Sequence, residues 1–204
     1  MAVYTHVPAE MLAELLARYD LGALISAKGI AEGVENSNYM VETERARIIL
    51  TLYEKRVDAA DLPFFLALLD HLADHGLPVP RALRDHDGVQ LQTVAGRPAC
   101  VIEFLPGVSV TTPSVAQTRA AGAALGDVHR ALADFVEERP NALGLDGWHA
   151  LAARCGSDLD HIAPGLARRV AEELAFLDCN WPATLRSEER RVGKECRSRW
   201  SPYH

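Results

Sequence analysis

The predominant hydrophobic pattern of this chain differs before and after Pro106-Gly107, and this difference limits the folds that the chain can adopt. Before this point, short apolar runs alternate with turn residues, which is typical of β-strands. After it, apolar residues recur at helical spacing, which is typical of amphipathic helices. A block of strands followed by a block of helices predicts an α+β fold.

The first block predicts a five-stranded antiparallel sheet with a helix inserted in it. The expected strands are residues 24–27, 38–43 and 46–53, a hairpin about the turn at 85–88, and a fifth strand at 100–105. A helix near residues 8–19 precedes the sheet, and another is expected over 58–75. The second of these helices is expected to meet the sheet through Phe64, Phe65, Leu68, Leu69 and Leu72.

Three further helices are expected after Pro106-Gly107. The first runs over residues 112–135, with Thr112-Pro113 as its cap and Leu125 on its apolar face. The other two lie near 148–162 and 164–179.

Composition excludes several classes of protein. The net charge of the 204 residues is −7, and residues 186–204 alone carry +3, so the rest of the chain carries −10. An acidic body argues against a nucleic-acid binder. The four cysteines are scattered without a C-x-x-C pair, and no run of apolar residues is long enough for a membrane span. These features predict a reduced, cytoplasmic protein with no membrane partner.

The segment 29–38 is the strongest candidate for a ligand site. It lies between the first two expected strands and combines glycines, amides and a hydroxyl, which can present donors to phosphate oxygens. The candidate residues are Gly29, Gly33, Asn36, Ser37 and Asn38. The same composition is also typical of an ordinary surface hairpin.

Four motifs in order resemble bacterial homoserine kinase of the aminoglycoside phosphotransferase fold. They are Gly-Ile-Ala-Glu-Gly-Val-Glu-Asn-Ser-Asn-Tyr (29–39), Ile-Leu-Thr-Leu-Tyr-Glu-Lys-Arg (49–56), Asp-Leu-Pro-Phe-Phe (61–65) and Arg-Pro-Asn-Ala-Leu (139–143). The resemblance implies a protein-kinase-like fold, with residues 1–105 as the N-lobe and 106–185 as part of a helical C-lobe. It also implies Mg²⁺-dependent phosphorylation of the hydroxyl of L-homoserine by ATP, a step toward threonine.

The resemblance also implies where the nucleotide binds. Adenine is expected at the hinge backbone around Glu103 to Leu105, and the phosphates at the loop. Thr51 occupies the strand position where related kinases place a cation, and Lys55 or Arg56 is the candidate replacement; the choice between them stays open. The helix over 58–75 has no Glu to pair with such a cation, and Asp61 and Asp70 are possible substitutes.

The family's catalytic segment, His-x-Asp-(x)4-Asn, and its Mg²⁺-binding Ile-Asp-Phe segment are not in this sequence. We therefore expect no catalytic residue and no metal ligand in the chain, which would be cut before the catalytic loop and inactive and poorly soluble alone. Residues 186–204 are expected to be a non-native tail. The alternatives are a non-catalytic nucleotide-binding module, or a related kinase acting on choline, methylthioribose or an aminoglycoside.

His71 and His75 stand four residues apart on one expected helix, which is a spacing that metal ligands use. No Glu follows His71, and the neighbouring aspartates are typical of a solvated helix face. The sequence therefore predicts no metal site at this position.

Overall fold

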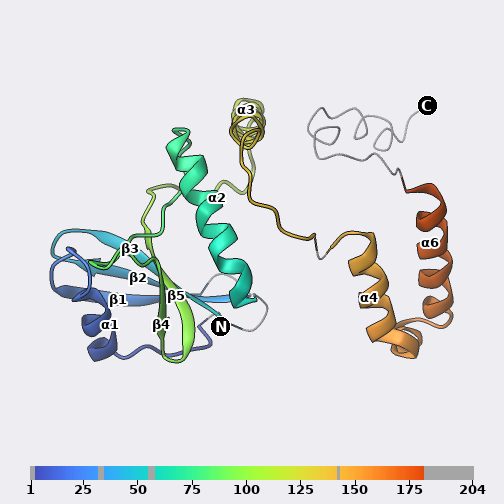
Figure 1. Ribbon diagram of the computed structural model, residues 1–204, viewed down its shortest axis with the longest axis horizontal. Coiled ribbons are helices and arrows are strands. Elements are labelled where there is room, and N and C mark those ends of the chain that lie inside the picture. The colour runs from blue at the N-terminus through green and yellow to red at the C-terminus, as the bar shows by residue number, and fades with distance from the viewer. Residues whose placement is uncertain (1–2, 32–34, 55–57, 142, 182–204) are drawn as a thin grey trace. The chain divides into compact units, whose positions relative to one another are not determined.

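The computed structural model divides into two compact units, residues 1–138 and 139–204, and each is described by itself (Figure 1). The predicted lobe boundary at Leu105 stays a prediction, as does the predicted tail, which lies outside the described residues. The residues that the structure describes are 3–31, 35–54, 58–141 and 143–181.

A five-stranded antiparallel sheet forms the centre of the first unit, in the order β1-β2-β3-β5-β4. The strands are β1 (Leu24–Ile30), β2 (Asn36–Thr43), β3 (Arg47–Tyr53), β4 (Leu91–Val94) and β5 (Arg97–Glu103). The helices of this unit are α1 (Ala9–Leu16), the 3-10 turn η1 (Ala59–Asp61), α2 (Leu62–Asp74) and α3 (Val115–Ala131). The predicted sheet and the α+β class are thus confirmed.

Each face of the sheet has its own core, because successive side chains of a strand point to opposite faces. On one face, Leu50 and Leu52 of β3 pack in one cluster with Leu16 of α1. On the other face, Cys100 of β5 packs with Leu66 of α2. Figure 1 shows the two helices on opposite sides of the sheet. We call these sides the α1 face and the α2 face.

Helix α2 is buried mainly through leucine, not through phenylalanine as predicted. Its buried residues are Leu62, Leu66 and Leu72, whereas Phe65 is 37% exposed. Phe64 forms an edge-on contact with Phe135, with ring centroids 5.7 Å apart. The burial of Leu72 agrees with the prediction, and the exposure of Phe65 contradicts it. Apolar residues surround most of the first two turns of α2, so periodicity alone could not identify the buried face.

The hairpin lies later in the chain than predicted, between β4 and β5. Residues 85–88 do form the expected turn. The chain before that turn pairs with β5, however, through a bridge between Ala82 and Ile102. Ala95 and Gly96 join β4 to β5 with φ values of 50° and 71°. Two positive φ values in a two-residue loop match a type I′ hairpin turn, which usually carries Asn or Asp rather than Ala at its first position.

Helix α3 begins later and ends earlier than predicted. Ser114 is its cap: Ser114 Oγ accepts from Gln117 N at 3.3 Å, and Gln117 Oε1 accepts from Ser114 N at 2.8 Å. This reciprocal pair is a capping box, and it replaces the predicted cap at Thr112. The helix ends at Ala131. Leu125, which was expected on a buried face, is 57% exposed.

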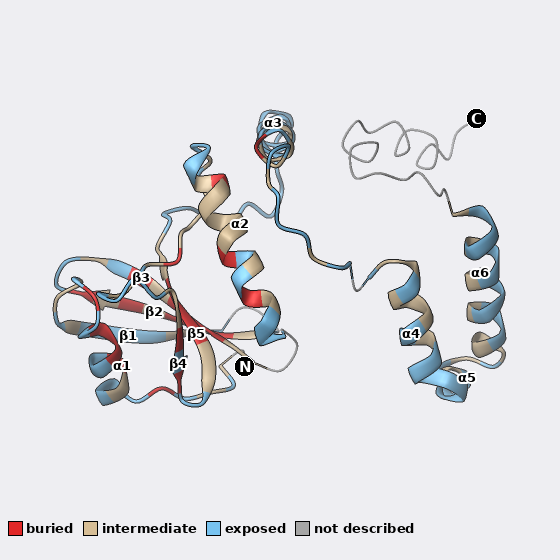
Figure 2. Ribbon diagram, in the orientation of Figure 1, coloured by how far each residue is buried: buried red, intermediate tan, exposed pale blue. Residues whose placement is uncertain are grey.

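The second unit contains helices only, among the residues described. They are α4 (Leu145–Cys155), the 3-10 turn η2 (Gly156–Asp158), α5 (Leu159–Ile162) and α6 (Leu166–Asn180). Trp148 and Trp181 meet edge-on with ring centroids 5.5 Å apart. None of the described residues of α4, α5 and α6 is buried (Figure 2). In the described part of the chain, no helix has the length and apolar character that a membrane crossing requires.

Candidate nucleotide-binding site

The connection between β1 and β2 is shorter than predicted. Gly29 and Ile30 belong to β1 and residues 36–38 to β2, so only residues 31–35 connect the two strands. Pairing across the sheet has overridden the turn preference of these residues, as it often does in strands. Gly33 lies outside the described residues, and its predicted phosphate contact stays a prediction.

Gly29 has a packing role that the sequence did not reveal. A Cβ atom at this position would lie 2.8 Å from Val3 Cγ2, which is too close for two carbon atoms. The lack of a side chain therefore lets the N-terminal segment lie against β1. This role stands beside the predicted phosphate contact and does not test it.

Ser37 is fully buried and points to the α1 face. Its Oγ accepts hydrogen bonds from Tyr4 N at 2.8 Å and Thr5 N at 3.1 Å, and donates to Glu54 Oε1 at 2.6 Å. A serine hydroxyl has a single hydrogen, and here Ser37 donates it in the hydrogen bond to Glu54. The geometry therefore argues against Ser37 as a donor to phosphate and gives it the role of fastening the N-terminal segment to the sheet.

Asn38 and Thr51 lie opposite each other on β2 and β3, and both point to the α2 face. Thr51 Oγ1 donates to Asn38 Oδ1 at 2.8 Å. Because the amide oxygen is used in this way, the NH₂ group is what Asn38 can offer to a ligand. Thr51 thus orients an amide donor, in the strand position where related kinases place a cation.

Asn36 shares the α2 face with Asn38, two residues away on the same strand. Its Oδ1 atom is buried and has no hydrogen-bond partner among the residues that the structure describes. Buried polar atoms are nearly always paired, so an unpaired amide oxygen beside the β1–β2 connection suits contact with a polar ligand or an ordered water.

Glu54 follows the last residue of β3. It directly precedes the two candidate cations, Lys55 and Arg56, which lie outside the described residues. Its side chain is 7% exposed, and its Oε2 lies 3.3 Å from Arg97 Nε. Together with the bond from Ser37, this ion pair fixes the carboxylate at the end of β3. Sequence reasoning missed this contact, because no spacing rule connects Glu54 with Arg97.

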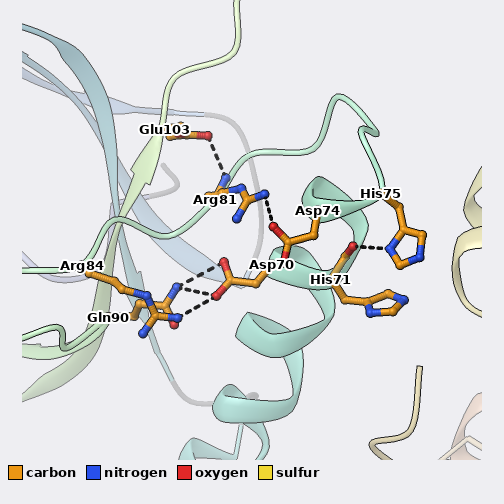
Figure 3. A network of polar contacts seen from close by, with 8 residues as sticks. All are labelled: Asp70, His71, Asp74, His75, Arg81, Arg84, Gln90 and Glu103. Carbon is orange, nitrogen blue, oxygen red and sulfur yellow. Dashed lines mark hydrogen bonds and ion pairs between the residues drawn. The ribbon is translucent and has the colours of Figure 1, made fainter. Parts of the chain in front are cut away.

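The acidic side chains of α2 are engaged by the segment that follows the helix (Figure 3). Asp70 accepts from Arg84 Nη2 at 2.9 Å and from Gln90 Nε2 at 3.1 Å. Asp74 accepts from Arg81 Nη2 at 2.6 Å, and this bond holds the pKa of the Asp74 carboxyl below its ordinary value. Asp70, a possible partner for a cation at the end of β3, therefore braces α2 against residues 81–90.

The end of β5 is the predicted adenine contact. The backbone N–H of Glu103 donates to Arg81 O at 2.9 Å, and Glu103 Oε2 accepts from Arg81 N at 3.1 Å. Since this N–H is used, a backbone donor for adenine would come from the residues after the strand. Leu105, the other predicted contact, is exposed there.

Cys100 lies opposite Thr51 on the α2 face and is fully buried. Burial raises the pKa of its thiol to about 11. Cys100 therefore stays a neutral thiol at physiological pH and contributes packing rather than nucleophilic chemistry.

Comparison with known proteins agrees with this geometry. A homoserine kinase of Zymomonas mobilis is 52% identical over 187 residues, and one of Azorhizobium caulinodans is 51% identical over 185 residues. Each match covers 91% of this chain and 58% of the relative, so the chain spans little more than half of their length. The predicted resemblance to homoserine kinases is thus confirmed.

Among solved structures, a spectinomycin phosphotransferase in complex with ADP and spectinomycin shares the fold, with a TM-score of 0.57 and 15% identity. That match covers 74% of this chain and 47% of the other. Residues 26–193 match the family model described as phosphotransferase enzyme family. Because this match includes most of the chain, the chain belongs to the phosphotransferase enzyme family.

Proposed function

We propose that this chain is the nucleotide-binding part of an ATP-dependent homoserine kinase of the cytoplasm. The whole enzyme would transfer the γ-phosphoryl group of ATP to the hydroxyl of L-homoserine, giving O-phosphohomoserine for threonine biosynthesis. The observation that carries the proposal is the 52% identity to a homoserine kinase over 91% of the chain. Identity at this level supports a shared function as well as a shared fold. The 15% identity to the spectinomycin enzyme supports the fold alone.

In this proposal the α2 face of the sheet receives the nucleotide. The amide NH₂ of Asn38, held by Thr51, donates to a phosphate oxygen, and Asn36 supplies a second amide nearby. Gly33 and a cation, Lys55 or Arg56, complete the phosphate site. Backbone groups after Glu103, including those of Leu105, contact adenine.

ATP would be bound together with Mg²⁺, which neutralises the phosphate charge when it is bound. Three candidate oxygen ligands near the site, from Asn38, Asp70 and Asp74, already accept hydrogen bonds. Asn38 Oδ1 accepts from Thr51, and the carboxylates of Asp70 and Asp74 are engaged by arginine. We therefore propose that none of these three residues is a ligand of Mg²⁺. The proposed role of this chain is to bind and orient the phosphates.

A chimera tests the substrate. Residues 1–181 would replace the matching part of the Zymomonas homoserine kinase, which supplies the remainder of the enzyme. We expect release of ADP that depends on homoserine, and none with choline, methylthioribose or spectinomycin. Turnover of one of these other alcohols alone would refute the substrate, and a folded chimera without any kinase activity would refute the enzyme proposal.

An isosteric substitution tests the nucleotide site in the same chimera. Asn38→Asp keeps the oxygen that accepts from Thr51 and replaces the NH₂ donor by a negative oxygen. We expect ADP to bind at least about tenfold more weakly, which corresponds to about 1.4 kcal/mol. Asn141→Asp adds the same charge to an exposed turn of the second unit and is the matched control. Equal ADP affinity in the two variants would exclude Asn38 from the site.

A further inference from the structure

Two imidazoles and a carboxylate converge at the C-terminal end of α2. His71 and His75 lie four residues apart and therefore on the same side of the helix. Figure 3 shows both rings on the side away from Arg81 and Arg84. Asp134, from the segment after α3, brings its Oδ1 to 3.3 Å from His71 Nε2 and 3.5 Å from His75 Nε2. One ligand atom from each of the three residues lies within 4.8 Å of the other two.

The two distances from Asp134 match those between neighbouring ligands of a zinc ion. Bonds of about 2.0–2.1 Å in a tetrahedral site place neighbouring ligand atoms about 3.3–3.4 Å apart. The carboxylate oxygen of Asp134 is already at that distance from one imidazole nitrogen and close to it from the other. A cation would therefore require little movement of Asp134 relative to either histidine.

The orientation of His75 also favours a cation. Its Nδ1 lies 2.9 Å from the carbonyl oxygen of His71, which can only accept a hydrogen bond. Nδ1 therefore carries the hydrogen, and in the neutral ring Nε2 presents a lone pair toward the carboxylate of Asp134. Two electron pairs that face each other repel, and a cation between them attracts both. A second ring nitrogen held by a backbone carbonyl is also the usual arrangement of a metal-binding histidine.

His71 has a different partner, the carbonyl oxygen of Ala131, at 2.7 Å from Nε2. On metal binding, the metal takes the place of the hydrogen at Nε2, and the neutral ring carries its hydrogen on Nδ1 instead. Ala131 is the last residue of α3, so its carbonyl has no partner within the helix. Once the hydrogen bond with His71 is lost, this oxygen can serve as a fourth ligand. The C-terminal ends of α2 and α3 both lie here, and helix dipoles favour a cation at such ends.

We propose that His71, His75 and Asp134 bind a divalent cation of the zinc class, which joins the end of α2 to the segment after α3. Imidazole ligands suit zinc, nickel, copper and cobalt better than magnesium, so this site is chemically distinct from any site for the Mg²⁺ of ATP. The sequence predicts no metal here because no Glu follows His71. The third ligand, Asp134, comes from a distant segment that no spacing rule connects with the two histidines.

The test is a titration of the 204-residue chain with Co²⁺, followed by displacement with Zn²⁺. Thiolates are the competing ligands, so the background carries Cys155→Ser, Cys179→Ser and Cys196→Ser. We expect the visible absorption of Co²⁺ bound by nitrogen and oxygen, its loss when Zn²⁺ is added, and a higher Tm with Zn²⁺. The variant Asp134→Asn, at a side chain that is 70% exposed, should weaken Zn²⁺ binding by about tenfold or more.

The matched control is His86→Gln. His86 Nε2 lies 3.5 Å from Asp20 Oδ1, and both groups are exposed. Among the described residues, no second histidine joins this pair. We expect no change in Zn²⁺ affinity from His86→Gln and a loss from His75→Gln. The proposal is overturned if the serine background binds no Co²⁺, or if Asp134→Asn and His75→Gln both keep the affinity of that background. None of these readouts depends on nucleotide binding.

Discussion

At the scale of single residues, Ser37 belongs to a predicted ligand segment and yet holds the N-terminal segment in place. Replacing it by alanine leaves two backbone N–H groups, of Tyr4 and Thr5, and the Glu54 carboxylate without that partner. A buried polar group that loses its partner costs about 1–3 kcal/mol. We therefore expect Ser37→Ala to lower the free energy of unfolding by about this amount, measured by urea denaturation.

The matched control is Ser26→Ala, at an exposed serine of β1, which should change the stability by less than about 0.5 kcal/mol. Nucleotide affinity separates the two roles of Ser37. If Ser37→Ala left stability unchanged but weakened ADP binding to the chimera, Ser37 would be a phosphate ligand, as the sequence predicts.

At the scale of elements, α3 depends on its own local signals, because Ala131 is its only buried residue. The capping box of Ser114 and Gln117 satisfies backbone groups at the start of the helix. We expect Ser114→Ala to lower the free energy of opening of α3 by about 1 kcal/mol. Amide hydrogen exchange in the first turns of α3 would measure the change.

Thr112→Ala is the control for this prediction. The sequence favours Thr112 as the cap because a proline follows it, but the structure places the helix start after Ser114. The Thr112 substitution should therefore leave exchange in α3 unchanged. An equal effect of the two substitutions would show that the helix starts before Val115.

Sequence patterns predicted which elements exist better than where they end. Alternation of apolar residues identified the strands of the sheet, because this period follows directly from the geometry of a strand. Turn composition assigned residues 29–38 to a loop, whereas pairing with the neighbouring strand extends β1 to Ile30 and starts β2 at Asn36. The contacts of Asp70 with Arg84 and of His71 with Asp134 depend on tertiary structure, which no spacing rule encodes.

At the scale of the whole molecule, the two units differ in how much apolar surface they bury. Both faces of the sheet in the first unit have buried cores, whereas the described residues of α4, α5 and α6 include no buried side chain. Leu174 and Leu177 of α6 are only half-buried, and Phe176 is exposed. Elements with few buried apolar contacts open at low cost in free energy.

We therefore expect amide hydrogens of β3 and β5 to exchange more slowly than those of α4 and α6 in the 204-residue chain. The difference should exceed about a hundredfold, which corresponds to about 3 kcal/mol in opening free energy. In the chimera, we expect the remainder of the enzyme to cover the apolar side of α6 and slow its exchange, with β3 as the internal reference. Equal protection of α6 and β3 in the 204-residue chain would contradict this prediction, because it would mean that the second unit is stable without a buried core.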